Sequence, residues 1–405
     1  MKVLIVNTHN NTGGAARAAR RLYEGLNETQ VKVIYYSKEE QNKLRNVVLK
    51  AKQRIKMFFD KLPIKLYRSR KQIPFSFSWL PGTSLTHAVE MYSPDIIHLH
   101  WVNGGFVDIR ELSILKLPIV WSIHDMWPFT GGCHYAGYCE KFIENCGNCH
   151  ALGSKSNFDI STIQMNLKRI HYKSANIKVV ASSRWMRRKI EKSTVLKSKP
   201  IVILPNPIDT REFSPIDCNK VRRKFNFPKN KKIILFGAMD ATADPRKGYV
   251  YLEKALSQLN PDNTVAVVFG SKDCCVTSIG EMQTYFMGPI GSNRTLVELY
   301  SAADVMVVPS LEENLSLSVV ESMACGTPVV SFRIGGNPDM IEHKKNGYLV
   351  DMISETELAN GIRWILEQPE DVSIRKNARA SAVEKYSKEV IIPKYIDFYH
   401  SIITQ

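Results

Sequence analysis

Two glutamates eight positions apart are the clearest candidates for binding or catalytic residues in this chain. Glu313 and Glu321 open and close the run Glu-Asn-Leu-Ser-Leu-Ser-Val-Val-Glu. Because a carboxylate has two oxygens, it can accept hydrogen bonds from both hydroxyls of a vicinal diol. The apolar spacing predicts a helix over 317–324 that is stopped by Gly326 and Pro328. Glu313 then lies in the loop before the helix and Glu321 lies inside it.

The start of this predicted helix suits an anion. The run Asp-Val-Met-Val-Val-Pro-Ser at 304–310 predicts a buried parallel strand that leads into the loop. Backbone N–H groups at a helix start lack partners within the helix and favour a phosphate. For either glutamate taken alone, an ordinary acidic helix start in solvent is the alternative. The N–H groups expected to bind phosphate belong to Asn314, Leu315, Ser316 and Leu317.

The whole stretch resembles a known family. The second glutamate is followed by Ser-Met-Ala-Cys-Gly-Thr-Pro-Val-Val at 322–330. The combination is similar to the signature of retaining glycosyltransferase family 4, of the bacterial surface-polysaccharide type. The resemblance implies an α/β chain of the GT-B type, with two Rossmann-like domains and a deep interdomain cleft. It also implies that Glu313 approaches the donor sugar and that Glu321 holds the nucleotide ribose.

The same resemblance implies that two adjacent basic residues, Arg246 and Lys247, bind the diphosphate of the donor. Lys247, directly before Gly248, matches the lysine that neutralises the departing nucleotide diphosphate. The matching arginine normally lies soon after the position of Gly237, where this chain has Ala238. Arg246 is therefore expected to act from a longer loop, and a solvent-exposed loop base is the alternative. The pair is expected to open the first helix of the second domain.

Two glycine-containing loops are expected to contact the nucleotide through the backbone. Gly13 and Gly14 lie between a strand-like run and the helix-forming run 15–22. Glycines there let the chain approach a diphosphate closely at a helix start, although such pairs more often mark tight turns. Family members carry a glycine pair in this loop. Gly288 and Ile290 resemble the place where family members hold the base.

His124 ends the strand-like run 118–124. In open α/β sheets the carboxyl ends of the strands line the binding crevice. The resemblance implies that His124 contacts sugar, and a packing or hydrogen-bonding histidine is the alternative. In the retaining mechanism that the resemblance implies, the acceptor attacks on the face that the diphosphate leaves. The protein then contributes positioning and electrostatic stabilisation, and catalysis requires no cofactor.

Four cysteines lie within seventeen residues, with the spacing Cys-x5-Cys-x6-Cys-x2-Cys. Disulfides are disfavoured in a cytosolic protein, and four clustered thiols suit a tetrahedral structural zinc site. His134 and His150 are spare ligands, and four reduced structural thiols are the alternative. The run Trp-Pro-Phe-Thr-Gly-Gly-Cys-His at 127–134 resembles a stretch in a subset of the family, near the acceptor side. The predicted ligands are Cys133, Cys139, Cys146 and Cys149.

Apolar strand-like runs alternate with helical stretches in two series, which predicts two parallel sheets. The run 201–209 carries two prolines between the series and is expected to be the domain linker. The expected divisions are an acceptor-side domain at 1–205, a nucleotide-sugar domain at 206–385 and a helix at 386–405. By resemblance, that helix crosses back to the first domain. The predicted strands are 3–6, 31–36, 95–100, 119–123 and 178–181 in the first series, and the second series begins at 232–237.

The excess of positive over negative charge is confined to the first half of the 405 residues. Residues 1–200 hold 32 Lys+Arg against 14 Asp+Glu, and residues 201–405 hold 23 against 25. The segment 43–71 carries eleven of these bases and one acid, Asp60, with apolar residues at helical spacing. Such a helix binds an anionic bilayer or packs its apolar stripe on its own domain. Nucleic acid is disfavoured, because no nucleic-acid module is present.

No apolar run reaches the roughly 18 residues of a spanning helix, and the first residues lead into structure. We therefore expect a cytoplasmic protein, peripheral on the inner face of the plasma membrane. The predicted function is transfer of a hexose-type sugar from a nucleotide diphosphate sugar to a lipid-linked or polysaccharide acceptor in cell-surface glycan synthesis. A nucleotide-sugar epimerase of the same fold and a non-catalytic nucleotide-sugar-binding protein are the alternatives.

Overall fold

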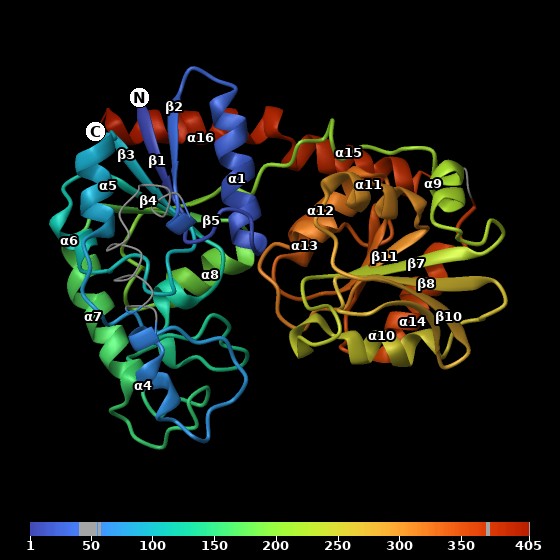
Figure 1. Cartoon of the computed structure of the whole chain (residues 1–405), viewed down its shortest axis with the longest axis horizontal. Helices are drawn as coiled ribbons and strands as arrows, with labels where there is room; N and C mark the ends of the chain where they lie inside the picture. Colours follow the sequence, from blue (N-terminus) through green and yellow to red (C-terminus); the bar gives the residue numbers. More distant parts are fainter. Residues whose placement is uncertain (40–54, 56–57, 370–372, 405) are drawn as a thin grey trace. The chain divides into compact units, whose positions relative to one another are not determined.

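The computed structural model describes residues 1–39, 55, 58–369 and 373–404, and it consists of two α/β units (Figure 1). The first unit contains residues 1–206 and 392–405, and the second contains residues 207–391. The sequence predicts these limits at 205 and 386, which are one and six residues earlier. Within the basic segment 43–71, residues 43–54, 56 and 57 lie outside the described residues.

A six-stranded parallel sheet forms the centre of the first unit, in the order β2-β1-β3-β4-β5-β6. The five predicted strands of the first series are confirmed. The prediction that 201–209 is entirely linker is wrong, because Ile201 pairs in parallel with Val179 and extends the sheet. The two prolines of this run come after the strand ends. The strands are β1 (Lys2–Val6), β2 (Lys32–Tyr36), β3 (Ile96–Leu99), β4 (Ile119–Ile123), β5 (Ile177–Ala181) and β6 (Ile201–Ile203).

Helices cover this first sheet, and its strands are apolar along nearly their whole length because both faces are buried. The final helix belongs to this unit from Ile392 onward, and Tyr395 and Tyr399 of that helix pack their rings against His98 of β3. The helices are α1 (Gly14–Asn27), α4 (Leu62–Lys65), α5 (Ser84–Tyr92), α6 (Glu111–Ile114), α7 (Ile160–Ser174), α8 (Arg184–Lys192) and α16 (Lys388–Ile403), with 3-10 turns η1 (Trp127–Phe129) and η2 (Lys141–Ile143).

A seven-stranded sheet forms the centre of the second unit, in the order β13-β12-β11-β7-β8-β10-β9. All neighbours are parallel except β9 and β10. Ile233 and Leu235 of β7 enter one apolar cluster, and Ile234 and Phe236 enter another on the opposite face. The strands are β7 (Lys232–Gly237), β8 (Thr264–Phe269), β9 (Cys274–Ile279), β10 (Met282–Met287), β11 (Val305–Val308), β12 (Val329–Phe332) and β13 (Gly347–Val350).

The helices of the second unit confirm the predicted helix over 317–324. No helix in the described ranges is both long and apolar enough to cross a membrane. The helices are α9 (Cys218–Lys224), α10 (Tyr249–Leu256), α11 (Asn293–Ala302), α12 (Leu317–Ala324), α13 (Asn337–Met340), α14 (Glu355–Leu366) and α15 (Ile374–Tyr386), with a 3-10 turn η3 (Pro245–Lys247).

Each sheet has one place where the strand order reverses. In the first sheet the chain runs from β1 to β2 on one side and continues with β3 on the other, and in the second sheet β7 lies between β8 and β11 in the same way. Loops on opposite sides of such a point leave a crevice at the carboxyl ends of the strands, which is where open α/β sheets bind ligands. A ligand site is therefore expected at the loops after β1, β3, β7 and β11.

Candidate functional site

The loops after β7 and β11 are joined by close backbone contacts. The Leu311 N–H donates to the carbonyl oxygen of Arg246 over 2.8 Å. Gly248 has a φ of +72°, and a Cβ there would lie 1.9 Å from the Pro309 carbonyl oxygen. Only glycine combines that conformation with that approach. The two loops therefore hold Lys247 beside the residues that follow β11.

Lys247 and Glu313 form an ion pair at this reversal point, with 2.9 Å between Nζ and Oε2. The Glu313 backbone is itself held, because Gly336 N–H donates to its carbonyl oxygen over 3.3 Å. Gly335 has a φ of +55°, and a Cβ there would lie 1.7 Å from that same oxygen. Sequence reasoning missed Gly335 and Gly336, although a Gly-Gly pair shortly after a predicted strand could have indicated them.

Arg246 binds Asp244, a residue of its own loop. Its guanidinium donates two hydrogen bonds to Asp244, over 3.1 and 2.6 Å. The expectation that 246–248 opens the first helix of this unit is wrong. The segment forms the 3-10 turn η3 directly before α10, and α9 comes earlier. Pro245 fits the first position of such a turn, since its φ is preset and its missing N–H is not needed there.

Glu321 lies inside α12 and is 1% exposed. Its Oε2 accepts a hydrogen bond from the Tyr300 hydroxyl over 2.9 Å, from the neighbouring helix α11. This bond holds the carboxylate in a fixed orientation. Tyr300 is a third residue that sequence reasoning missed, because an apolar helix position gave no reason to single it out.

The start of α12 has the features expected of an anion site. Ser316 is the N-cap residue, and its hydroxyl bonds to the Ser318 hydroxyl over 2.9 Å rather than to a backbone N–H of the helix. The N–H groups of the first turn are thus left for another acceptor. Asn314, Leu315 and Ser316 are buried, so this loop has a fixed shape.

The predicted base-holding residues lie at the same edge of the second sheet. Gly288 follows β10 with a φ of +66°, and its carbonyl oxygen accepts from Gly270 N–H over 2.7 Å. A Cβ at Gly270 would lie 1.8 Å from the Ala238 carbonyl oxygen, so the loops after β7, β8 and β10 also approach closely. Ile290 packs half-buried against the core of this unit.

In the first unit, Gly13 precedes α1 with a φ of +92° and Gly14 begins the helix. Glycine is required at position 13 by that φ. A Cβ at either position would meet nothing within 4 Å, so the start of α1 is sterically open. This is compatible with close approach of a ligand to the backbone.

His124 belongs to a chain of buried imidazoles that sequence reasoning did not foresee. Its Nε2 lies 2.9 Å from Nδ1 of His100, and the rings stack. His98, two residues before His100, contacts the Tyr399 hydroxyl and the Ser122 hydroxyl. Burial lowers the pKa of His124 to about 4. His124 is therefore neutral at pH 7, and it suits hydrogen bonding to a sugar better than acting as a cation.

Asp125, next to His124, connects two aromatic side chains. His134 Nδ1 lies 2.7 Å from its Oδ2, and Trp101 Nε1 donates to the same oxygen over 3.0 Å. Burial acts to raise the pKa of Asp125, but His134 and the hydrogen bonds outweigh it and hold the pKa below its usual value. The Trp101 ring stacks with His9 and with His134. A polar and aromatic cluster thus lies at the reversal point of the first sheet.

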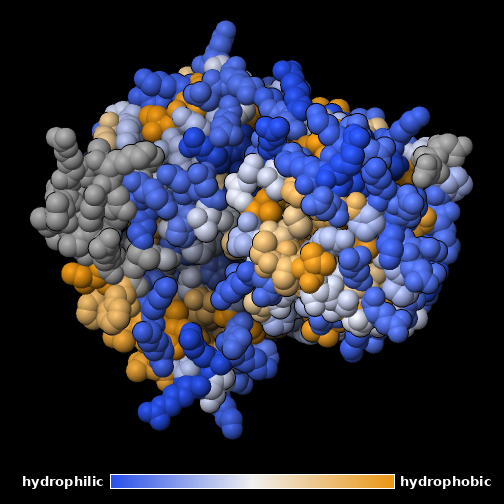
Figure 2. Space-filling model, turned by 45° about the vertical axis from the view of Figure 1, so that its right-hand side comes forward, coloured by the Kyte–Doolittle hydropathy of each residue, from blue (hydrophilic) through white to orange (hydrophobic). Residues whose placement is uncertain are grey.

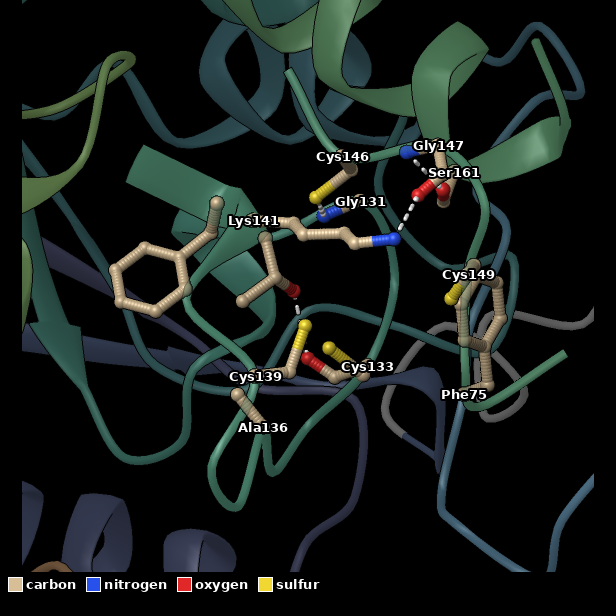
Figure 3. Close-up of a pocket in the computed structure, with 12 residues that line it drawn as sticks. Phe75, Gly131, Cys133, Ala136, Cys139, Lys141, Cys146, Gly147, Cys149 and Ser161 are labelled. Atoms are coloured by element: carbon tan, nitrogen blue, oxygen red, sulfur yellow. Dashed lines mark hydrogen bonds between the residues drawn. The ribbon is translucent and has the colours of Figure 1, made fainter. Parts of the chain in front are cut away.

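The four predicted zinc ligands line a single pocket in the first unit, together with Lys141, Phe142 and Ser161 (Figure 3). All four cysteines are free thiols. As the side chains stand within the described ranges, no three His, Cys, Asp or Glu groups are close enough together to hold a metal ion. Burial raises the pKa of Cys146 to about 12, so without a metal this thiol stays protonated.

Comparison with known proteins matches each unit to a family of glycosyltransferases. Residues 12–212 match the family described as Glycosyltransferase Family 4, and residues 217–381 match the family described as Glycosyl transferases group 1. An uncharacterized glycosyltransferase of Methanocaldococcus jannaschii is 27% identical over 327 residues, which cover 75% of each chain. A D-inositol 3-phosphate glycosyltransferase of Mycolicibacterium smegmatis is 30% identical over 308 residues, covering 73% of this chain and 65% of that one.

Solved structures show the same architecture. Sucrose-phosphate synthase from Thermosynechococcus elongatus aligns over 100% of this chain and 99% of its own, with a TM-score of 0.71 and 19% identity. The Anabaena protein HepE, solved in complex with UDP-glucose, aligns over 99% of this chain and 100% of its own, with a TM-score of 0.65 and 17% identity. With one glycosyltransferase domain matched in each half, the chain is a glycosyltransferase of the GT-B fold.

Proposed function

We propose that this protein moves a hexose-type sugar from a nucleotide diphosphate sugar to a lipid-linked or polysaccharide acceptor, with retention of configuration, in the synthesis of a cell-surface glycan. The observation that carries the proposal is the Lys247–Glu313 pair at the reversal point of the second sheet. It brings a cation for a leaving diphosphate and a carboxylate for a sugar hydroxyl within 3 Å of each other, at an edge that also carries the start of α12.

Each part of a nucleotide sugar finds a suitable group in the second unit. The N–H groups at the start of α12 would bind phosphate, and the buried carboxylate of Glu321 would accept from the ribose hydroxyls. The backbone around Gly288 and Ile290 would hold the base. Anabaena HepE and the sucrose-phosphate synthase share only the fold with this chain, so their ligands suggest compounds to test and do not identify the donor.

Charge at the leaving group would dominate the chemistry. As the bond between sugar and diphosphate breaks, negative charge grows on the phosphate oxygen, and Lys247 would stabilise it more strongly in the transition state than in the bound donor. When the donor binds, its phosphate would replace the Glu313 carboxylate as the partner of Lys247. This exchange would free the Glu313 carboxylate for a sugar hydroxyl.

The acceptor is assigned to the polar and aromatic cluster of the first unit. His124 would present a neutral imidazole, and the shared carboxylate of Asp125 would fix the rings of Trp101 and His134. Rings that are fixed by hydrogen bonds lose little entropy when they contact a sugar.

Slow donor hydrolysis separates the candidate functions. Purified protein is incubated with a panel of nucleotide sugars that includes UDP-glucose, without an acceptor, and the products are followed by chromatography. We expect release of nucleoside diphosphate and free sugar from one donor. An isomerised nucleotide sugar would establish an epimerase, and an unchanged panel despite measurable binding would establish a binding protein. The anomeric configuration of the transferred sugar, read by NMR, then tests retention.

We further propose that the first unit docks on an anionic bilayer. The described part of the segment 55–71 exposes large apolar side chains, with Phe58 59% and Leu66 77% exposed. Ile64 anchors the segment in a small apolar cluster with Phe77 and Leu152. Figure 2 shows apolar surface at the lower left of the visible face, bordered by hydrophilic side chains. The exposed bases of this segment are Lys61, Lys65, Arg68, Arg70 and Lys71.

Exposed apolar groups beside bases suit a membrane surface, because the apolar groups enter the interface while the bases meet acidic headgroups. Changing Lys61, Lys65 and Arg68 together to Gln is expected to weaken binding to vesicles with acidic lipid by about 3 kcal/mol, at about 1 kcal/mol per base. Sedimentation with vesicles measures this loss. Added salt should weaken binding of the unmodified protein as well.

A matched variant removes the same charge elsewhere. Lys220, Lys229 and Lys254 are exposed lysines of the second unit, and their joint change to Gln should leave vesicle binding within about twofold, since they lie outside the docking segment. An equal loss of vesicle binding in both variants would mean that the overall charge of the protein, and not the docking segment, determines binding. Binding of equal strength to neutral vesicles would contradict the proposal.

A further inference from the structure

The segment between η1 and α7, residues 130–159, is long and has little regular structure. Apart from the turn η2 and a single bridge between Phe75 and Cys133, no helix or strand is present in it, and all its residues are described. Loops of this length within a compact domain usually need their own stabilising device. The segment is nevertheless partly buried, and Phe142 and Leu152 are 1% exposed.

All four clustered cysteines direct their side chains into one pocket within this segment (Figure 3). The chain between the last two is tightly wound, since Cys146, Gly147 and Asn148 have φ values of +57°, +84° and +43°. Two non-glycine residues in this conformation are costly and persist only where their surroundings fix them. The winding allows Cys146 and Cys149 to face the same pocket, as both ligands of a Cys-x2-Cys metal site must.

Backbone N–H groups already point at the sulfurs. Gly131 N–H donates to Cys146 Sγ over 3.3 Å. The N–H groups of Ala151 and Leu152 lie against the Cys149 sulfur, two and three positions further along the chain. Donors of this kind stabilise a thiolate and orient it, which is the usual role of the groups behind a metal's direct ligands.

A buried cation lies beside the pocket. Lys168 of α7 is fully buried, and its Nζ donates to the carbonyl oxygens of Trp127 and Thr130. The charged forms of Cys146 and Cys133 are the groups whose charge acts on it most strongly. A divalent ion with four thiolates carries a net charge of about −2, and a buried ammonium offsets part of it.

We propose that one Zn²⁺ ion binds Cys133, Cys139, Cys146 and Cys149 in a tetrahedral structural site. The thiols must rotate inward to reach the Zn–S distance of about 2.3 Å, since they are not grouped closely enough as they stand. Zinc suits this set because it prefers four thiolates in a closed site, and binding releases the thiol protons. The site is separate from the residues proposed to bind the donor.

The metal would fix part of the acceptor-side cluster. His134 directly follows Cys133, and its backbone N–H donates to the Pro74 carbonyl oxygen. Its ring holds Asp125 and contacts the Ser76 hydroxyl. A zinc ion on Cys133 would therefore anchor the chain one residue away from the histidine that positions Asp125 and Trp101.

Elemental analysis of the full chain, purified without added metal or an affinity tag that binds metal, tests the site. We expect about one zinc per chain. The double variant Cys146→Ser/Cys149→Ser should lose it. The matched variant Cys274→Ser/Cys275→Ser changes two exposed cysteines of β9 and should keep it. Zinc below about a tenth of an equivalent in folded protein, or full zinc in the first variant, would overturn the proposal.

Cobalt provides a readout that does not depend on the variants folding. Unmodified protein is stripped with a chelator and loaded with Co²⁺, whose absorption distinguishes tetrahedral thiolate ligands from water or carboxylate. We expect strong sulfur-to-cobalt bands, and we expect cobalt to protect four of the eight thiols from an alkylating reagent that reacts with them in the stripped, metal-free protein. Weak absorption, typical of oxygen ligands, or eight reactive thiols in the loaded protein would contradict the site even if the double variant proved insoluble.

Discussion

Replacing Lys247 with alanine is expected to lower the turnover number by about 100-fold or more, while donor affinity falls by less than about tenfold. The reason is the state of Lys247 before the donor binds. Its ammonium is already paired with Glu313. Binding the ground-state diphosphate only exchanges one anion for another, whereas the extra charge that develops as the bond breaks is a new interaction for the lysine. Calorimetry and the rate of nucleoside diphosphate release measure the two effects separately.

Lys254 provides the matched control for this variant. It lies in α10, close to Lys247 in sequence, but its side chain is 61% exposed and pairs loosely with Glu355 over 3.7 Å. Lys254→Ala removes the same charge and should leave turnover and affinity within about twofold, because exposed pairs contribute little. Equal losses of turnover and affinity in Lys247→Ala would mean that the lysine only anchors the donor.

The elements of the second unit follow closely from local patterns. The strand before Glu313 is a continuous apolar run, and the helix that contains Glu321 is an apolar run ended by Gly326 and Pro328. The structure places this helix, α12, at Leu317–Ala324. Buried parallel strands are continuous apolar runs, and helix ends carry their own stop residues. Such features depend on a few neighbouring residues, so one sequence is enough to predict them.

Contacts between distant loops are not encoded in local patterns. Gly248 is adjacent to Lys247 and was visible in the sequence, but its need for glycine comes from the Pro309 carbonyl, sixty-one residues later. Gly335 likewise depends on Glu313. The ion pair between Arg246 and Asp244, two residues earlier, was also not foreseen from the sequence, and the role of Arg246 at the diphosphate stays a prediction.

In the first unit, too, local sequence patterns did not predict some elements and contacts. Ile201–Ile203 was expected to be linker because two prolines follow, yet a three-residue strand is too short for its periodicity to be distinctive. His98 and His100 were passed over because an isolated histidine in an apolar run is usually a core residue. Only the sheet brings His100 beside His124 and Tyr399 beside His98, the latter pair 301 positions apart.

Glu321→Gln is expected to weaken binding of the nucleoside diphosphate by about 1.5–3 kcal/mol, which is roughly 10- to 150-fold. The amide keeps the shape of the carboxylate but removes the charge that strengthens its bonds to ribose hydroxyls. The fold should be retained, because the amide oxygen can still accept from the Tyr300 hydroxyl. Calorimetry measures the affinity, and unchanged affinity would rule out contact between Glu321 and the ribose.

Tyr300→Phe separates a ribose contact from a merely structural role. It removes the hydroxyl that orients the Glu321 carboxylate and should cost about 0.5–1.5 kcal/mol of binding free energy. The decisive readout is the preference for a nucleoside diphosphate over its 2′-deoxy form. This preference should be large in the unmodified protein, smaller in Tyr300→Phe and smallest in Glu321→Gln, because the 2′-hydroxyl needs an oriented, charged acceptor. If all three proteins show the same preference, weaker binding in the variants reflects disturbed packing between α11 and α12, and the ribose must bind elsewhere.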